Sequence, residues 1–199
     1  MAAHCICSQS RPAQFLRGSL LAAVCLVAAC TNEKPPLATE NKPAMAAFCA
    51  VVETHRQTFE AIQAKPNYLD KRRDLDVAFD QRSAALLDLL KDGAFTGWTA
   101  KVDSVSLGLT GDADFAVRLP CDATLEVAES VQPDSLLFGE LRKVHEGGTV
   151  KVSGNFIARP PGETDNLYKT GYSERSLTRW GSIWKPTFLV RLTKIEPSN

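Results

Sequence analysis

Residues 135–156 read SLLFGELRKVHEGGTVKVSGNF, and in this stretch a helical pattern gives way to a strand pattern. Its first half repeats apolar residues at the spacing of one helix face, namely Leu136, Leu137, Leu141 and Val144. Gly147 and Gly148 would end such a helix. Its second half begins an alternation typical of one strand face, formed by Val150, Val152, Phe156 and Ala158. The stretch therefore predicts a short helix over about 135–144 that leads directly into a strand.

Four further segments carry the alternation of strands. The alternating apolar residues are Trp98, Ala100 and Val102 in the first, Phe115, Val117 and Leu119 in the second, and Phe188, Val190 and Leu192 in the last. Residues 121–127 form another candidate strand, and residues 109–113 read as a turn. Val105 is out of phase with the first segment, which predicts a bulge or bend. Three strands, a helix and two strands follow the order of the OB-fold, a five-stranded Greek-key barrel plugged at one end by that helix.

Two longer helices are predicted before the barrel, over residues 44–64 and 68–91. The expected inner faces are Phe48, Val51, Val52, Phe59 and Ile62, and then Leu75, Phe79, Leu86, Leu89 and Leu90. The other face of the second helix carries charges of both signs and is expected to be solvated: Lys71, Arg72, Arg73, Asp74, Asp76, Asp80 and Arg82. The predicted class is α+β, with two N-terminal helices packed on a five-stranded OB-type barrel.

The N-terminal segment has the pattern of an export signal. Arg11 and Arg17 precede an apolar run over residues 20–29, which is too short to cross a bilayer. Its end, Leu26-Val-Ala-Ala-Cys30, resembles the bacterial lipobox. That resemblance implies cleavage before Cys30 and a lipid on its thiol, whose acyl chains, palmitate among them, hold the chain on a membrane. Cleavage after Ala29 without lipid is the alternative.

The expected organisation has four parts. Residues 1–29 form the lipoprotein signal peptide and residues 30–43, rich in Pro, Asn, Lys and Glu, form a tether. Residues 44–92 form a helical segment, and residues 93–199 form the OB-fold domain.

Charge and cysteine content narrow the possible functions. The chain is formally neutral, and removal of residues 1–29 leaves 21 basic and 23 acidic residues, which argues against a general polyanion binder.

After export only Cys49 and Cys121 would remain beside Cys30. An even pair in an oxidising compartment favours a disulfide. Two buried thiols are the alternative, and a catalytic thiol is less favoured because no histidine adjoins either cysteine.

The last part of the chain also resembles a known group of domains. The resemblance rests on Trp98-Thr-Ala-Lys-Val102, residues 136–141, residues 145–156, Glu174-Arg-Ser-Leu-Thr178, Trp180-Gly-Ser-Ile183 and residues 186–192. These stretches resemble the tRNA-anti-like group of bacterial OB-fold domains over residues 93–196. The resemblance implies an OB barrel. It does not imply nucleic-acid binding, because a fold does not determine a function.

Catalytic and metal-binding patterns are missing from the sequence. The histidines, His4, His55 and His145, have no metal-ligand spacing, and no nucleophile elbow or phosphate-binding glycine loop occurs. Asp112 and Asp114 flank one residue of a turn, for which solvation is a simpler explanation than calcium binding. We therefore expect a protein that is not an enzyme and has neither a metal nor a cofactor.

The stretch from 159 to 181 is the best candidate for contact with a partner. It connects the last two strands, and this loop is one of the two that carry ligands in OB-folds. Residues 142–199 hold ten basic and five acidic residues, whereas residues 97–141 hold two and eight. The expected contact residues are aromatic or basic: Tyr168, Tyr172, Arg175 and Arg179. Trp180 and Trp184 are alternatively a packed base under the loop, and chance surface charge is the competing explanation for the basic residues.

These observations together predict a lipid-anchored protein of the cell envelope. The expected location is the outer membrane facing the periplasm, with the inner membrane as the alternative. The expected function is a non-enzymatic binding module for an envelope protein or glycan, a class that includes immunity and exclusion factors. The alternative is an OB-fold protein that binds single-stranded nucleic acid, which the charge balance and the compartment disfavour.

Overall fold

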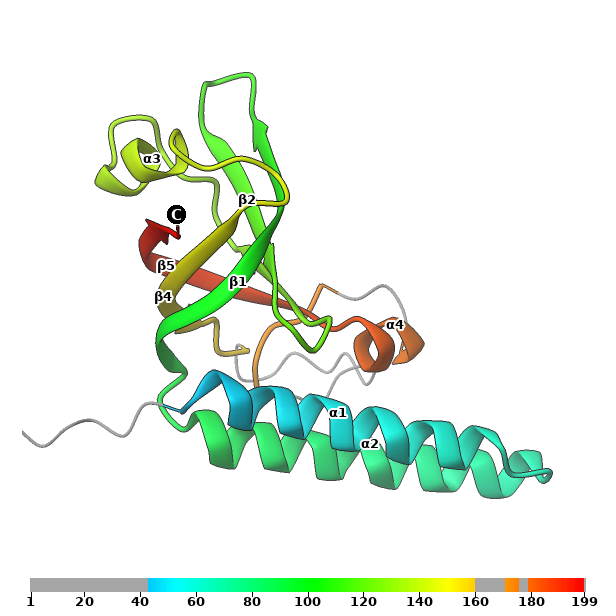
Figure 1. Cartoon of the computed structure of the whole chain (residues 1–199). Helices are drawn as coiled ribbons and strands as arrows, with labels where there is room; N and C mark the ends of the chain where they lie inside the picture. Colours follow the sequence, from blue (N-terminus) through cyan, green and yellow to red (C-terminus); the bar gives the residue numbers. More distant parts are fainter. Residues whose placement is uncertain (1–42, 160–170, 176–178, 199) are drawn as a thin grey trace, which may run out of the picture. The chain divides into compact units, whose positions relative to one another are not determined.

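A computed structural model describes residues 43–159, 171–175 and 179–198 (Figure 1). All of them belong to one compact unit. The expected signal peptide, the lipidation site Cys30 and all of the tether except Pro43 lie outside the described residues. No helix within the described ranges is long and apolar enough to span a membrane.

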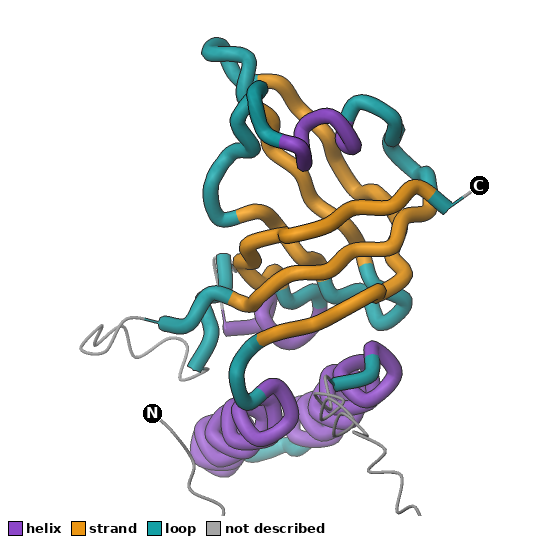
Figure 2. Tube along the Cα trace, turned by 90° about the vertical axis from the view of Figure 1, so that its left-hand side faces the viewer, coloured by secondary structure: helices purple, strands orange, loops and turns teal. Residues whose placement is uncertain are grey.

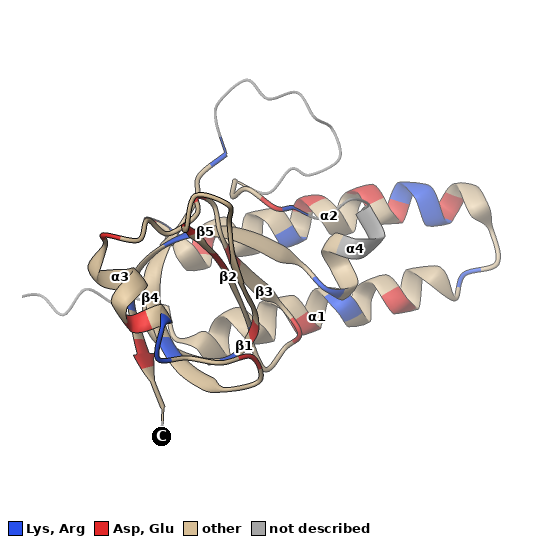
Figure 3. Ribbon diagram, turned by 90° about the horizontal axis from the view of Figure 1, so that it is seen from above, with Lys and Arg blue, Asp and Glu red and all other residues tan. Residues whose placement is uncertain are grey.

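The two predicted N-terminal helices are present within one residue of their expected ends. Helix α1 runs over Met45–Gln63 and helix α2 over Tyr68–Leu90. Pro66 separates them, and the Asn67 side chain caps α2 by accepting a hydrogen bond of 2.9 Å from the Leu69 amide. Figures 1 and 3 show the helices side by side, joined by this short turn. Each buries one stripe, which in α1 consists of Phe48, Val52, Phe59 and Ile62.

Five strands close into a barrel in the order β1-β2-β3-β5-β4 (Figure 2). The strands are β1 (Ala94–Leu107), β2 (Ala113–Arg118), β3 (Thr124–Val127), β4 (Thr149–Phe156) and β5 (Thr187–Pro197). Strands β3 and β5 are parallel, and every other pair is antiparallel. Helix α3 (Leu136–Leu141) lies between β3 and β4. The predicted α+β class with an OB-type barrel is confirmed, as is the bulge before Val105, where the register shifts between Val102 and Ser104.

Helices α1 and α2 lie across one end of the barrel, as Figures 1 and 2 show. The ring of Phe48 enters an aromatic cluster, with ring centroids 5.1 Å from Trp98, 5.6 Å from Phe156 and 5.5 Å from Phe188. The cysteines reinforce this attachment, because Cys49 of α1 and Cys121 of the β2–β3 connection lie at disulfide distance, with Cα atoms 5.3 Å apart. This is the arrangement that the favoured pairing requires.

Helix α3 is shorter than the sequence pattern indicates. Ser135 caps its first turn and the helix ends at Leu141, so it makes fewer than two turns. Only Leu141 is fully buried against the barrel. Leu136 was expected to face inward, and this is wrong, since its side chain is 94% exposed. As the first residue of a very short helix, it points away from the side that Leu141 packs.

Part of the long connection between β4 and β5 is extended and forms isolated bridges with its neighbours. Residues 171–175 lie between the end of β4 and the start of β5, through isolated bridges of Tyr172 with Ala158 and of Glu174 with Phe188. The Ser173 amide donates to the Ile157 carbonyl at 2.8 Å, and Ser173 accepts from the Leu189 amide at 2.9 Å. Helix α4 (Arg179–Trp184) follows before β5. The segment 171–175 therefore fills the gap where β4 and β5 diverge.

Arg82 requires a correction. It was expected on the solvated face of α2, yet its side chain is 2% exposed. The reason is geometric: Arg82 follows Phe79 by three residues and precedes Leu86 by four, so it lies on the buried stripe of the helix. The burial is compensated by Glu174, whose carboxylate accepts from both terminal nitrogens of Arg82, at 3.0 and 3.3 Å.

Candidate functional site

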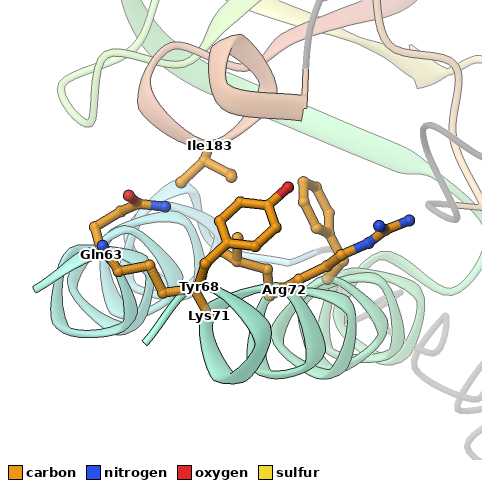
Figure 4. A pocket seen from close by; sticks show the side chains of 7 residues that line it. Gln63, Tyr68, Lys71, Arg72 and Ile183 are labelled. Carbon is orange, nitrogen blue, oxygen red and sulfur yellow. The ribbon is translucent and has the colours of Figure 1, made fainter. Parts of the chain in front are cut away.

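A surface pocket with polar and apolar walls lies where the α1–α2 turn meets α4 (Figure 4). We call it the tip pocket, and its lining residues are Gln63, Tyr68, Lys71, Arg72, Leu75, Phe79 and Ile183. Its volume is about 390 Å³, which falls within the range of small-molecule sites. Three elements build it: the consecutive helices α1 and α2, and α4, which is distant from them in the sequence.

The floor of the tip pocket is apolar and belongs to a small core separate from that of the barrel. Phe79 and Ile183 are 6% and 2% exposed, and both join this cluster, against which the partly buried Leu75 packs. The rings of Phe59 and Phe79 pack edge to face with centroids 5.0 Å apart. The floor is therefore held by packing and is present before any ligand binds.

The rim of the tip pocket is aromatic and cationic. Tyr68 is 72% exposed, although it is a large amphipathic side chain. Figure 4 shows Lys71 and Arg72 extending to opposite sides of the Tyr68 ring, with Ile183 facing them from α4. Within the described part of the chain neither cation forms an ion pair. The rim thus carries two positive charges that no carboxylate of the described residues neutralises by direct contact.

The neighbouring cations show that this lack of pairing is selective. Arg73 contacts Asp70 at 3.6 Å and Asp74 at 3.3 Å, and Lys65 contacts Asp74 at 2.5 Å. The hydrogen bond from Lys65 is the main cause that lowers the pKa of Asp74. Asp70 and Asp74 therefore pair with Arg73 and Lys65, and neither Lys71 nor Arg72 has an ion pair among the described residues.

The structure places two of the four expected contact residues in different surroundings, and the other two lie outside its description. Tyr172 is 4% exposed, with its ring centroid 5.6 Å from that of Phe156, so its side chain is part of the core and does not lie exposed in the loop. Its hydroxyl donates to the Lys91 carbonyl at 3.3 Å, and burial raises its pKa. Arg175 is exposed and pairs with Glu126 on β3. Tyr168 and the side chain of Arg179 are not among the described residues.

The segment 171–175 is bound to α2 at three successive points. Gly171 lies so close to Leu87 that a Cβ atom there would stand 2.1 Å from a Leu87 methyl carbon. Tyr172 reaches the carbonyl of Lys91, and Glu174 pairs with Arg82. The guanidinium carbon of Arg82 also lies 5.6 Å from the centroid of the Phe188 ring. These contacts make Arg82 and Tyr172 structural residues of the interface between α2 and the barrel.

His55 lies on the inner stripe of α1 and shares this environment. Its Nδ1 atom is buried without a hydrogen-bond partner. Burial lowers the pKa of its imidazole, and the positive charge of Arg82 lowers it further. Arg56, the next residue, donates to the carbonyls of Cys121 at 2.7 Å and Trp184 at 3.1 Å, which links α1 to the barrel and to α4. The polar residues of this region thus serve attachment between elements.

Neither the metal-ligating side chains of the described residues nor the comparisons with known proteins indicate a function. Among the described residues no group of three or more His, Cys, Asp or Glu side chains could hold a metal ion. Comparison of the chain with known protein families, with curated proteins and with solved structures found no match.

The sequence signal for the tip pocket was present but incomplete. The run Lys71-Arg72-Arg73 is visible, but the mixed charges around it indicate a solvated face. The spacing rule for helix surfaces does not single out Arg73, because it also offers Asp74 to Lys71 and Asp76 to Arg72. Nor does any spacing rule predict that Ile183 of α4 would close a pocket over Leu75 and Phe79.

Proposed function

We propose that the chain is a membrane-anchored lipoprotein of the cell envelope, held by a lipid on Cys30, and that its folded unit is a non-enzymatic binding module. A protein or glycan of the envelope is the partner class that the sequence favours. The single structural observation that supports a binding role is the tip pocket, because its unpaired cations and exposed tyrosine surround a preformed apolar floor. Aromatic and arginine side chains of this kind dominate the energetics of binding sites.

The alternative, an OB-fold protein for single-stranded nucleic acid, is less well supported by the barrel surface. A nucleic-acid groove needs cations that are free to neutralise phosphates. Several cations on the barrel instead pair with carboxylates: Arg118 with Asp103, Arg175 with Glu126, and Arg191 with Glu129. These pairs reduce the positive potential along the strands, and the proposal therefore assigns binding to the tip pocket.

Fractionation of cells that produce Cys30→Ser tests the anchor. The wild-type chain is expected in the membrane fraction, and the variant is expected either in the soluble envelope fraction or as an unprocessed precursor. A variant that is processed and stays membrane-bound like the wild type would show that the lipoprotein assignment is wrong.

Capture from detergent-solubilised envelopes tests the binding role of the tip pocket. The wild-type chain and Arg73→Ala should retain the same envelope component, and Arg72→Ala should lose it. Arg73 is the matched control, since it is adjacent to Arg72 but has carboxylate partners. Equal capture by all three proteins would remove the tip pocket from the proposal.

A further inference from the structure

We propose that the tip pocket binds an anionic amphiphile, with its acidic head at Arg72 and its apolar chain on Leu75, Phe79 and Ile183. This inference rests on the proposed function, because it specifies the ligand class of the same pocket. It depends on three properties of the lining: the apolar floor, the unpaired cations, and the position of Tyr68 between them.

The floor determines the apolar part of the ligand. Phe79 and Ile183 are buried against Phe59, yet they still line the pocket, so they present apolar surface at its base. A purely polar ligand would leave this surface in contact with water, whereas an acyl chain would cover it, and the removal of apolar surface from water favours binding. The volume of about 390 Å³ suits a chain of medium length or the first part of a longer one.

The rim determines the charge of the ligand. Arg72 presents a planar guanidinium that matches the two oxygens of a carboxylate or phosphate. Lys71 lies on the other side of Tyr68 and adds positive potential without converging on the same point (Figure 4). We therefore expect Arg72 to contribute more to affinity than Lys71.

Tyr68 completes the match with an amphiphile. Its ring separates the two cations and is 72% exposed, so it stands at the boundary between the charged rim and the apolar floor. Tyrosine is favoured where one end of a contact is apolar and the other is wet. The same boundary exists in an amphiphile, between its acidic head and its first methylene groups.

Isothermal titration of the full chain carrying Cys30→Ser, which cannot be lipidated, tests the inference with four probes. Decanoate and decyl phosphate, used as monomers, combine an acidic head with an apolar chain. Decanol lacks the charge, and inorganic phosphate lacks the chain. Saturable binding is expected for the first two probes, with both controls at least about tenfold weaker, since decanol lacks the charge-assisted hydrogen bonds to Arg72 and inorganic phosphate lacks the apolar contact with the floor.

Single substitutions on α2 then locate the binding. Arg72→Ala should weaken decanoate binding about tenfold or more, Lys71→Ala should weaken it less, and Arg73→Ala should leave it unchanged. All three residues are at the surface of α2, so thermal melting of each variant should match the parent. Decanol binding as tight as decanoate binding, or equal affinity of Arg72→Ala and Arg73→Ala, would overturn the proposal.

An experiment with vesicles distinguishes binding of a free amphiphile from binding to a membrane surface. Sedimentation with vesicles of phosphatidylglycerol and phosphatidylcholine should show no dependence on Arg72 beyond that of Arg73. Arg72-dependent vesicle binding without monomer binding would refute the free-amphiphile assignment. If Arg72→Ala abolishes envelope capture while no probe binds, the binding module stands and only the ligand class is wrong.

Discussion

Arg72 and Arg82 lie on the same helix, α2, but their side chains have opposite environments in its two halves. Arg82 lies in the half that packs on the barrel, is 2% exposed and has both terminal nitrogens on Glu174. Arg72 lies in the half at the tip, lines an open pocket and has no ion pair within the described residues. A buried charge must be neutralised within the fold, whereas a charge at a pocket rim can remain solvated until a ligand arrives. The barrel half is therefore structural, and the tip half is available for binding.

The largest effect should come from breaking the buried pair. Arg82→Met leaves the Glu174 carboxylate buried without a partner and should lower the free energy of unfolding by about 3–5 kcal/mol. Urea denaturation measures this loss, and Arg82→Met combined with Glu174→Leu should recover most of it. A loss below about 1 kcal/mol for Arg82→Met would mean that Glu174 reaches water, and the contrast between the two halves of α2 would disappear.

The cysteine pair should have the next largest effect, because it fixes α1 to the barrel. Denatured, non-reduced protein should show no titratable thiol from Cys49 or Cys121, and a peptide map should link their fragments. Replacing both by Ala should lower the free energy of unfolding by about 2–4 kcal/mol. Two reactive thiols in protein taken from the envelope would contradict the pairing.

A smaller effect should appear as a pH dependence at His55. Its pKa in the folded protein is lowered from the ordinary value of 6.5, so the unfolded chain binds a proton at a higher pH than the folded chain does. The free energy of unfolding should therefore fall as the pH decreases below about 6.5. His55→Gln should remove this part of the slope in denaturation curves measured between about pH 7.5 and 5.5. An unchanged slope would exclude His55 as its source.

The smallest effect is expected at the tip. Arg72→Ala should change the free energy of unfolding by no more than about 0.5 kcal/mol, the usual range for surface substitutions. Urea denaturation beside Arg82→Met provides the direct contrast on one helix. A loss comparable with that of Arg82→Met would show that Arg72 stabilises the fold and is not reserved for a ligand.

Most of the fold was predictable because it follows from local periodicity. Alternating residues such as Phe115 and Val117 face the barrel interior, and residues such as Phe48 and Val52 recur on one face of α1. The order of elements then selected the OB-type barrel. The candidate site was less predictable. Tyr172 was expected as a contact residue in a long loop, but residues 171–175 bridge Ala158, just beyond β4, and Phe188 of β5, and the Tyr172 side chain lies in the core.

By itself the sequence determined the two helices and the succession of strands, since helix and strand periods act over a few residues. Only the tertiary structure decided that Arg82 is buried on Glu174 and that Ile183 closes a pocket beside Arg72. Those outcomes depend on which side chains meet across long sequence separations. The residues around a charged side chain on the inner face of a helix do not reveal its partner. The partner belongs to another element, which only packing brings close.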